Sequence, residues 1–382
     1  MPEWDRVSLG EVLTRSRETV TVDPHRTYKQ VTVRMKHKGV ILREEKSGAA
    51  IGTTRQFLAR PGQFIISSID ARNGANGLIP EALAGAIVTN DFWLFNVDAS
   101  RLYREWLDLY SSTPDFVDAC TAASEGTTNR VRLKEDRFLA LEIPLPPLPE
   151  QQRIVARVKG LLAKVEEAQR LANERDEMSQ RLLRSVFMTM TADPPTYPLG
   201  EVAPLVRRPI EVVDGKSYAE LGVRSFGRGT FHKPNLSALD VGTKKLFGIE
   251  PGDLLFNIVF AWEGAVAVAQ PEDAGRVGSH RFLTCVANPN LALPEFLNFY
   301  FQTPQGLADL GTASPGGAGR NRTLSLKNVA LLPVPVPAVQ QQQYFVSLLN
   351  RTIGVSKQRE SLQPQLHALP ASILAQAFAG AL

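Results

Sequence analysis

The residues best suited to chemistry fall in short strings that resemble catalytic motifs but leave them incomplete. GKS at residues 215–217 matches the end of a phosphate-binding loop, yet Ile210 stands where that loop requires its first glycine. DPPT at residues 193–196 resembles the DPPY or NPPY tetrad of amino-methyltransferases, but Thr196 replaces the aromatic residue that stacks on a flipped base. We interpret the first string as a turn and the second as a linker.

A third string, EEK at residues 44–46, could complete the carboxylate–lysine motif of a nuclease. No acidic partner on an adjacent strand is evident, so we expect an exposed turn before Ser47 instead. The sequence also lacks GxSxG, HExxH and helicase motifs. Its five histidines never fall at metal-ligand spacing, and Cys120 and Cys285 are expected to be core residues. The sequence therefore predicts no catalytic residues and no metal site.

Basic and polar residues beside glycine-rich loops recur in both halves of the chain. Such side chains can reach phosphates and base edges, and we predict a DNA-binding surface in each half. The candidates in the first half are Arg34, Lys36, Lys38, Ser67, Arg72, Asn73, Asn76, Thr128, Asn129, Arg130 and Arg132. Those in the second half are Arg224, Arg228, His232, Lys233, Asn257, Trp262, His280, Arg281, Arg320, Asn321, Arg322 and Lys327.

The composition is that of an ordinary globular protein. The 382 residues suggest roughly two or three domains. The net charge of +4 and the pI near 9.0 are compatible with a polyanionic partner. No apolar run is long enough to span a membrane, and no secretory signal is visible, so we expect a cytoplasmic protein.

The chain repeats itself at a shift of 190 residues. LGEV at residues 9–12 recurs at 199–202, and RPGQFI at 60–65 corresponds to EPGDLL at 250–255. A proline-rich segment ending in glutamines follows at 143–152 and again, shifted by 191, at 334–343. A period this long indicates a domain duplication and excludes a solenoid repeat.

Each copy begins with short buried strands and helices and ends in a long helix. We predict an α+β fold in which two similar mixed domains, residues 1–145 and 193–335, are separated by two helical segments, residues 146–192 and 336–382. The first helix has a heptad seam, which requires a partner helix, and an antiparallel pairing with the second is the economical arrangement. Pro364 and Pro370 predict a kink or break in the second helix. The seam of the first helix is Ile154, Val158, Leu161, Val165, Ala168, Ala172, Arg175, Ser179, Leu182 and Val186, and the buried side of the second is Phe345, Leu349, Ile353, Leu362, Leu366, Leu369, Ile373 and Phe378.

Three features together resemble the DNA specificity (S) subunit of type I restriction-modification systems. They are the LGEV opening of each half, the strand EPGDLLFNIV, and the segment from GTTNRVRLK to the proline-rich LPPLPEQQRIVARV. The resemblance covers essentially the whole chain. It implies two target recognition domains that each read half of a split DNA site, and an antiparallel coiled coil that docks methyltransferase (M) subunits.

The resemblance also implies which chemistry belongs to other chains. The S subunit has no catalytic residues of its own, whereas S-adenosylmethionine, ATP and Mg serve the M and restriction (R) subunits. The residues implied in docking are Leu148, Glu150, Gln151, Ile154, Val339, Gln341 and Phe345. In the second copy Gln341 replaces Glu150, so one M subunit is expected to bind less tightly.

Two other functions remain open from the sequence. The chain could be a coiled-coil interaction scaffold without sequence reading of its own, which salt-sensitive binding to duplex DNA would exclude. It could also be a nuclease that uses residues 44–46, which Glu44→Ala and Lys46→Ala would test.

Overall fold

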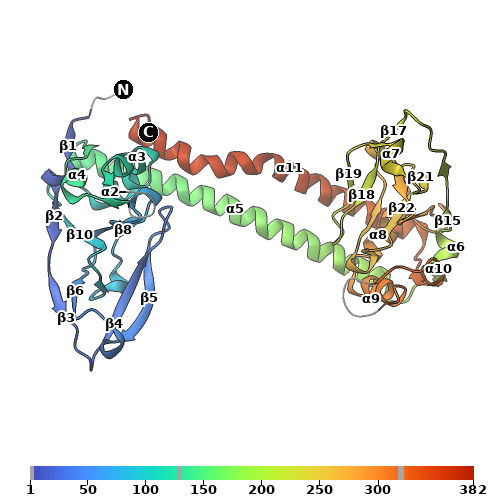
Figure 1. Ribbon diagram of the computed structural model, residues 1–382, viewed down its shortest axis with the longest axis horizontal. Helices are drawn as coiled ribbons and strands as arrows, with labels where there is room; N and C mark the ends of the chain where they lie inside the picture. The colour runs from blue at the N-terminus through green and yellow to red at the C-terminus, as the bar shows by residue number, and fades with distance from the viewer. Residues whose placement is uncertain (1–3, 127–130, 317–321) are drawn as a thin grey trace. The chain divides into compact units, whose positions relative to one another are not determined.

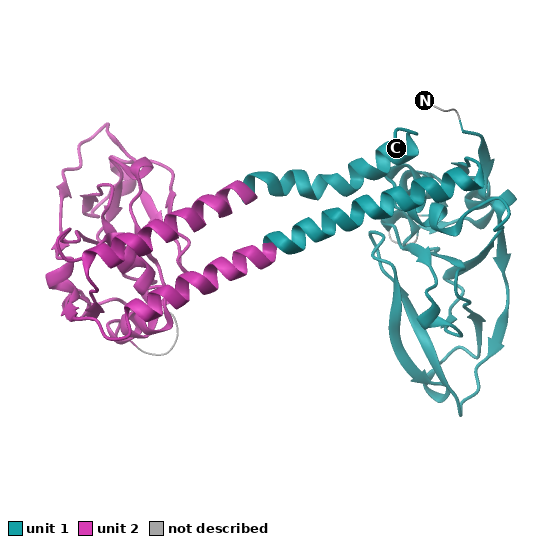
Figure 2. Cartoon of the chain, turned by 180° about the vertical axis from the view of Figure 1, so that it is seen from behind, with its two compact units in different colours: residues 1–172, 360–382 teal, residues 173–359 magenta. Residues whose placement is uncertain are grey.

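The computed structural model describes residues 4–126, 131–316 and 322–382, and the chain divides into two units (Figures 1 and 2). Unit 1 comprises residues 1–172 and 360–382, and unit 2 comprises residues 173–359. Both units mix strands and helices, as predicted. No helix within the described residues is long and apolar enough to cross a membrane.

Unit 1 contains two main antiparallel sheets and two short ribbons. A four-stranded sheet has the order β2-β10-β7-β8, and a five-stranded sheet has the order β3-β6-β9-β4-β5 with one parallel contact between β4 and β9. The strands are β1 (Arg6–Ser8), β2 (Leu13–Ser16), β3 (Thr19–Thr21), β4 (Thr27–Val33), β5 (Val40–Ser47), β6 (Arg55–Leu58), β7 (Phe64–Ser67), β8 (Asn76–Leu78), β9 (Ile87–Val88), β10 (Phe92–Val97), β11 (Ser124–Glu125), β12 (Arg132–Leu133) and β13 (Glu142–Pro144). The helices are α1 (Leu9–Val12), α2 (Arg104–Ser111), α3 (Pro114–Ala122), α4 (Glu135–Leu139) and the first part of α5 (Leu148–Met190), with 3₁₀ turns η1 (Gly48–Ala50), η2 (Ala71–Asn73) and η3 (Glu81–Leu83).

Unit 2 repeats the four-stranded sheet, in the order β15-β25-β22-β23, and divides the rest among smaller sheets. Its strands are β14 (Thr196–Pro198), β15 (Leu205–Val206), β16 (Pro209–Ile210), β17 (Ser217–Tyr218), β18 (Leu221–Val223), β19 (Thr230–His232), β20 (Leu236–Ser237), β21 (Leu246–Gly248), β22 (Leu254–Asn257), β23 (Val266–Val268), β24 (Val277–Ser279), β25 (Phe282–Cys285) and β26 (Pro333–Pro335). Its helices are α6 (Leu199–Val202), α7 (Ala238–Val241), α8 (Pro294–Tyr300), α9 (Pro304–Thr312), α10 (Leu326–Ala330) and the first part of α11 (Val339–Phe378), with 3₁₀ turns η4 (Ala261–Glu263) and η5 (Pro271–Asp273).

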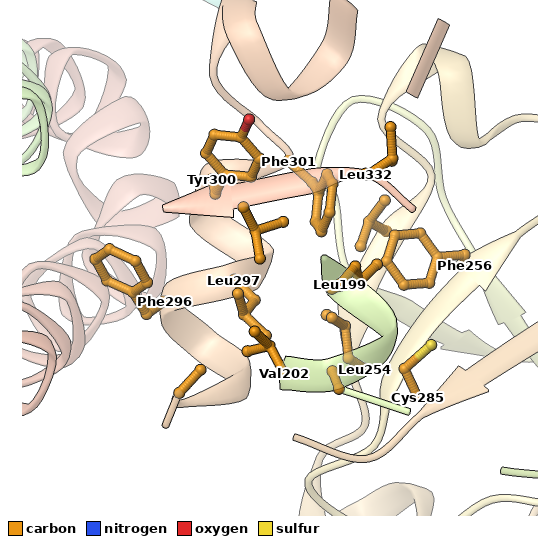
Figure 3. Packing of buried hydrophobic residues seen from close by; sticks show 14 of the residues in the cluster. Leu199, Val202, Leu254, Phe256, Cys285, Phe296, Leu297, Tyr300, Phe301 and Leu332 are labelled. Carbon is orange, nitrogen blue, oxygen red and sulfur yellow. The ribbon is translucent and has the colours of Figure 1, made fainter. Parts of the chain in front are cut away.

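The repeated LGEV motif forms a single helical turn on which each core is built. Leu199 and Val202 are buried, and Figure 3 shows them lying among Leu254, Phe256 and Leu297. Leu9 and Val12 are buried in the same way in unit 1. The glycine between them lets the turn approach its neighbour closely: a Cβ at Gly10 or at Gly200 would lie 3.2 or 3.1 Å from the carbonyl oxygen of a residue at the end of α4 or α10. The motif recurs because both units need this same contact.

The two long helices pair within each unit. In unit 1, Ile154, Val155 and Val158 of α5 share a core with Ala377 of α11. In unit 2, the other end of α5 packs against the beginning of α11 through Phe187 and Phe345, whose ring centroids are 5.4 Å apart. Since the start of one helix always meets the end of the other, the antiparallel pairing is confirmed.

The predicted seam of α5 is confirmed at Ile154 and Val158 but departs from the buried row at residues 168, 175 and 182, which are exposed. Leu182 is 55% exposed whereas Leu183 is 1% exposed, and Leu162 rather than Leu161 packs on the core of unit 1. Residues 158, 165, 172, 179 and 186 belong to both rows, but the buried row continues through 162, 169, 176 and 183. On α11 the exposed residues Ile353, Leu362 and Leu369 were likewise predicted to be buried.

The structure corrects two further predictions, a break in the second helix and a turn at residues 44–46. Helix α11 continues without a break through Pro364 and Pro370. Each proline removes one helical hydrogen bond, and for Pro364 the carbonyl released, on Glu360, belongs to an exposed residue that water can reach. The EEK string does not form a turn but lies in strand β5, where Lys46 and Glu44 form a 3.8 Å ion pair.

Candidate nucleic-acid interface

In unit 1, the basic loop at residues 34–39 is the turn of the β4–β5 hairpin. The turn is closed by the Arg34 amide, which donates to the Gly39 carbonyl at 3.0 Å. Lys36 and His37 have φ of 58° and 52°, in the left-handed region. Their amides donate to the carbonyls of Asn73 at 2.7 Å and Gly74 at 3.0 Å, which fixes the hairpin tip on turn η2. These bonds hold the turn that carries Arg34, Lys36 and Lys38 next to Asn73, at the end of η2.

The β18–β19 hairpin of unit 2 is fixed in the same way, at a shift of 190. The Arg224 amide donates to Gly229 at 3.0 Å, and Phe226 and Gly227 have φ of 61° and 64°. The Phe226 amide donates to Glu263 at 2.8 Å and the Gly227 amide to Gly264 at 3.1 Å. The duplicated backbone contacts bring Arg224 and Arg228 beside turn η4, which carries Trp262.

Positive charge is exposed at both hairpins. Arg34, Lys36, Lys38, Arg224 and Arg228 are all exposed. Among the described residues, no ion pair includes any of them. Unpaired cations on a rigid protrusion suit phosphate and base-edge contacts, because neither a competing carboxylate nor loop ordering has to be overcome. Each hairpin and its turn together form what we call a reading surface.

The residues near the second reading surface include an arginine stacked on an aromatic ring. The guanidinium of Arg322 lies 5.5 Å from the ring centroid of Trp262, whose indole N–H donates to the Val259 carbonyl at 3.1 Å. The amide of Val259 in turn donates to the Asn257 side chain at 3.2 Å. Trp262, Asn257 and Arg322 are all half-buried, and Trp262 and Asn257 shape the turn.

Two predicted DNA-binding residues of unit 1 are instead structural. Ser67 is buried, and its hydroxyl accepts from the Asp70 amide at 3.1 Å. Asn76 is buried, and its side-chain oxygen accepts from the Ser111 hydroxyl at 2.7 Å. Both stabilise the loop that carries Arg72 and Asn73, and neither side chain is accessible to DNA.

Three other candidates are held by acidic neighbours. Arg132 pairs with Asp91 at 2.6 Å, and Lys233 pairs with Glu220 at 3.0 Å. The His232 ring lies 3.0 Å from the buried carboxylate of Asp273, which also accepts from the Thr230 hydroxyl. His280, Arg281 and Lys327 are exposed, and Thr128, Asn129, Arg130, Arg320 and Asn321 lie outside the described residues.

The predicted partner-docking residues divide by burial. Gln151, Ile154 and Phe345 are buried within their own units, so their side chains do not face a partner. The Gln151 oxygen accepts from the Tyr103 amide at 2.8 Å, and its nitrogen donates to two backbone carbonyls. Gln342 makes the same three bonds in unit 2, to Leu293, Leu291 and Pro337. Leu148, Glu150, Val339 and Gln341 retain exposed or half-exposed side chains at the two helix starts.

Comparison with known proteins gives the family. The model of the type I restriction modification DNA specificity domain matches residues 1–174. Residues 1–174 belong to this family. Over these residues the match confirms the resemblance that the sequence showed, and with it a DNA-specificity role. Specificity domains are DNA-recognition components. A search of curated proteins found no match to the chain.

Solved structures show that the fold extends through the second copy. The HsdS subunit from Thermoanaerobacter tengcongensis has a TM-score of 0.70 at 20% identity, covering 100% of this chain and 98% of that one. A chain from a structure of complex assembly and conformational transition in the type I R-M system has a TM-score of 0.69, also at 20% identity, covering 100% and 99%. The specificity-subunit fold is therefore confirmed over the whole length.

Proposed function

We propose that this chain is the non-catalytic subunit that determines which DNA sequence a type I methyltransferase and nuclease assembly recognises. Each unit reads half of a split site. The observation that carries the proposal is the pair of basic hairpins, fixed by the same backbone bonds but carrying different side chains at their tips. Shared anchoring preserves the docking geometry, and different tips select different bases. Because the units are linked in one chain, binding of the second half-site is intramolecular, which multiplies specificity.

We further propose that the exposed ends of the helix pair dock M subunits, and R subunits through them. In unit 2, Gln341 and the exposed Tyr344 line a cavity of about 440 Å³ together with Ser185, Val186 and Met190. In unit 1, Leu148 and Tyr103 line a cavity of about 530 Å³. An exposed aromatic residue beside an apolar hollow is the feature by which protein interfaces anchor a partner side chain. S-adenosylmethionine, ATP and Mg are assigned by this proposal to those partners.

The test is modified-base sequencing of DNA from cells that express this chain with its cognate M subunit. We expect a split methylated motif that disappears when the chain is omitted. Exchanging residues 1–143 for those of a relative should change one half of the motif and leave the other unchanged. An active, bound M subunit that methylates the same sites without this chain would refute the proposal.

A further inference from the structure

The tip of the second hairpin exposes a large apolar side chain. Phe226 is 70% exposed, although a phenylalanine ring normally gains free energy by burial. Its φ of 61° is unfavourable as well, because the left-handed conformation costs an L-residue with a Cβ extra free energy. The three non-glycine residues with positive φ in the described part of the chain are Lys36, His37 and Phe226, and all lie at the two hairpin tips. Strain and exposure coincide at one aromatic residue.

The surroundings of Phe226 hold it rigidly in this position. Its amide donates to the Glu263 carbonyl, and the Ser225 hydroxyl donates to the Glu263 carboxylate at 3.2 Å. The next residue is also fixed, since the Gly227 amide donates to the Gly264 carbonyl at 3.1 Å. The hairpin therefore cannot relax to bury the ring without breaking its bonds to η4. An exposed ring on a rigid support is organised for contact with something outside the chain.

The neighbours of the ring are cationic. The Arg228 guanidinium lies 6.0 Å from the centroid of Phe226, and that of Arg224 lies 4.7 Å from the centroid of Phe231. An apolar protein partner would require these charges to be desolvated, whereas a nucleic acid offers phosphates to the arginines and a flat π-surface to the ring. Apolar side chains that enter a base step and partly unstack it are an established way of reading duplex DNA.

We propose that Phe226 is a stacking wedge that enters a base step of the half-site read by unit 2, while Arg224 and Arg228 contact the flanking phosphates. This inference rests on the proposed function and adds a specificity-determining residue to it. At the equivalent position unit 1 carries Lys36, which cannot stack. The wedge therefore belongs to one half-site only, and that half-site should favour a step that unstacks easily.

The test uses the full chain with its M subunit on duplexes that carry 2-aminopurine at single positions of the methylated motif. The fluorescence of this base analogue rises when it is unstacked. We expect a rise at one step in the half-site of unit 2 and none in that of unit 1. Phe226→Ala should abolish the rise and weaken binding on the order of tenfold, as for loss of one base–aromatic stack. Phe226→Trp should retain both.

Phe226→Lys and Leu331→Ala complete the design. Lysine at this position reproduces the tip of unit 1, where Lys36 has the same backbone conformation, so the variant should fold and lose only the fluorescence rise. Leu331 is another exposed apolar residue of unit 2, next to α10, and its loss should change neither signal. If the wild type binds the motif without a rise, or Phe226→Ala binds and fluoresces as the wild type does, the wedge is refuted and DNA reading stands. If the wild type binds no motif, the proposed function fails as well.

Discussion

The tips of the two hairpins share a backbone conformation but carry side chains of different chemistry. Residues 36 and 37 of unit 1 and residues 226 and 227 of unit 2 share the left-handed conformation and donate to equivalent carbonyls on η2 and η4. The side chains differ: Met35 and Lys36 expose an apolar group followed by a cation, whereas Ser225 is followed by the apolar Phe226. Backbone hydrogen bonds hold the hairpin tip in place without using its side chains. After a duplication the position of a reading surface can therefore be kept while the side chains at its tip change.

The helix starts show the same division between frame and surface. Gln151 and Gln342 are both fully buried and make equivalent hydrogen bonds. One residue earlier, Glu150 is bound by Arg153 at 2.7 Å, while its counterpart Gln341 is exposed without that ion pair. Arg153 also donates to the Leu382 carbonyl at 2.8 Å, which joins the segment after α11 to the start of α5 in unit 1. The helix start is therefore charged in unit 1 and neutral in unit 2.

The largest expected effect is on the stability of unit 2 relative to unit 1, and it comes from the phenylalanine that anchors α5 in unit 2. Phe187 is buried and packs against Phe296 and Phe345, so Phe187→Ala should cost unit 2 about 3–5 kcal/mol. Each unit has one buried thiol, Cys120 or Cys285, and burial raises the pKa of both to about 12, which suppresses alkylation at neutral pH. In Phe187→Ala, Cys285 should become reactive at lower urea than Cys120.

The control for this experiment is Met188→Ala, because Met188 is the exposed neighbour of Phe187 on the same helix. It should leave both thiols protected. If Cys120 and Cys285 become reactive together in Phe187→Ala, the two units unfold as one cooperative block, and the distinction between them would not extend to stability.

A smaller and symmetric effect is expected at the two buried glutamines. Gln151→Leu or Gln342→Leu leaves two carbonyls and one amide without their partner, which should cost roughly 1–3 kcal/mol in the unit concerned. Urea unfolding followed at Cys120 and Cys285 would measure both. Gln152→Leu and Gln343→Leu are matched controls on exposed neighbours and should be near neutral. Unequal losses would show that the helix starts are not equivalent supports.

These glutamines also show what a sequence can and cannot predict. The repeat predicted the duplication, the fold class and the helix pair, because LGEV and the glutamine-rich helix starts serve buried contacts that both units require. The family resemblance implied that Gln151 meets a partner, and the pattern of polar loops assigned Ser67 and Asn76 to DNA. All three are buried, and a polar residue that is hydrogen-bonded inside the protein has the same sequence signature as an exposed one.

The prediction of the buried row of α5 was partly wrong for a different reason. Two heptad rows share residues 158, 165 and 172 and differ only in the residue between them, and adjacent Leu182 and Leu183 satisfy either row. The sequence of α5 does not decide which leucine is buried; the core of unit 2, to which Leu183 belongs, does. Phe226 was overlooked because an aromatic residue is read as core, although its place 190 residues after Lys36 identified it as the tip of a reading surface.

At the hairpins, the comparison predicts two kinds of DNA contact. Lys36→Ala should remove one phosphate contact, weakening binding and lowering the slope of log affinity against log salt by about 1. Phe226→Ala should weaken binding with little change in that slope, since stacking releases no counterions. Titrations at several salt concentrations would distinguish them, with Lys164→Ala on the exposed face of α5 as the control. Equal slope changes in both variants would mean that the two tips make the same kind of contact.

The smallest effect is expected where the helix pair is polar. In unit 1 the seam of α5 is apolar at Val155, Val158 and Val165, whereas in unit 2 Arg359 of α11 donates to Asp176 and to Asn173 of α5. Burial of Asp176 opposes its ionisation, but hydrogen bonds from Arg359 and Arg175 outweigh it and hold the pKa below the usual 3.8. Such a pair fixes helix register more than it adds stability.

Asp176→Asn removes this charge and retains the shape of the side chain. Because the pKa of Asp176 is lowered by folding, the carboxylate stabilises unit 2 above about pH 4 and ceases to do so as the pH falls through the lowered value. We therefore expect a loss of about 0.5–1 kcal/mol at pH 7, measured by urea unfolding at Cys285, that disappears in acid and shrinks in high salt. Glu177→Gln, on the neighbouring residue, removes only an exposed ion pair with Arg181 at 3.6 Å and should show a much smaller dependence on pH and salt. A penalty that stays constant from pH 7 to below pH 3 would mean that the shape of the Asp176 side chain, and not its charge, stabilises the polar part of the seam.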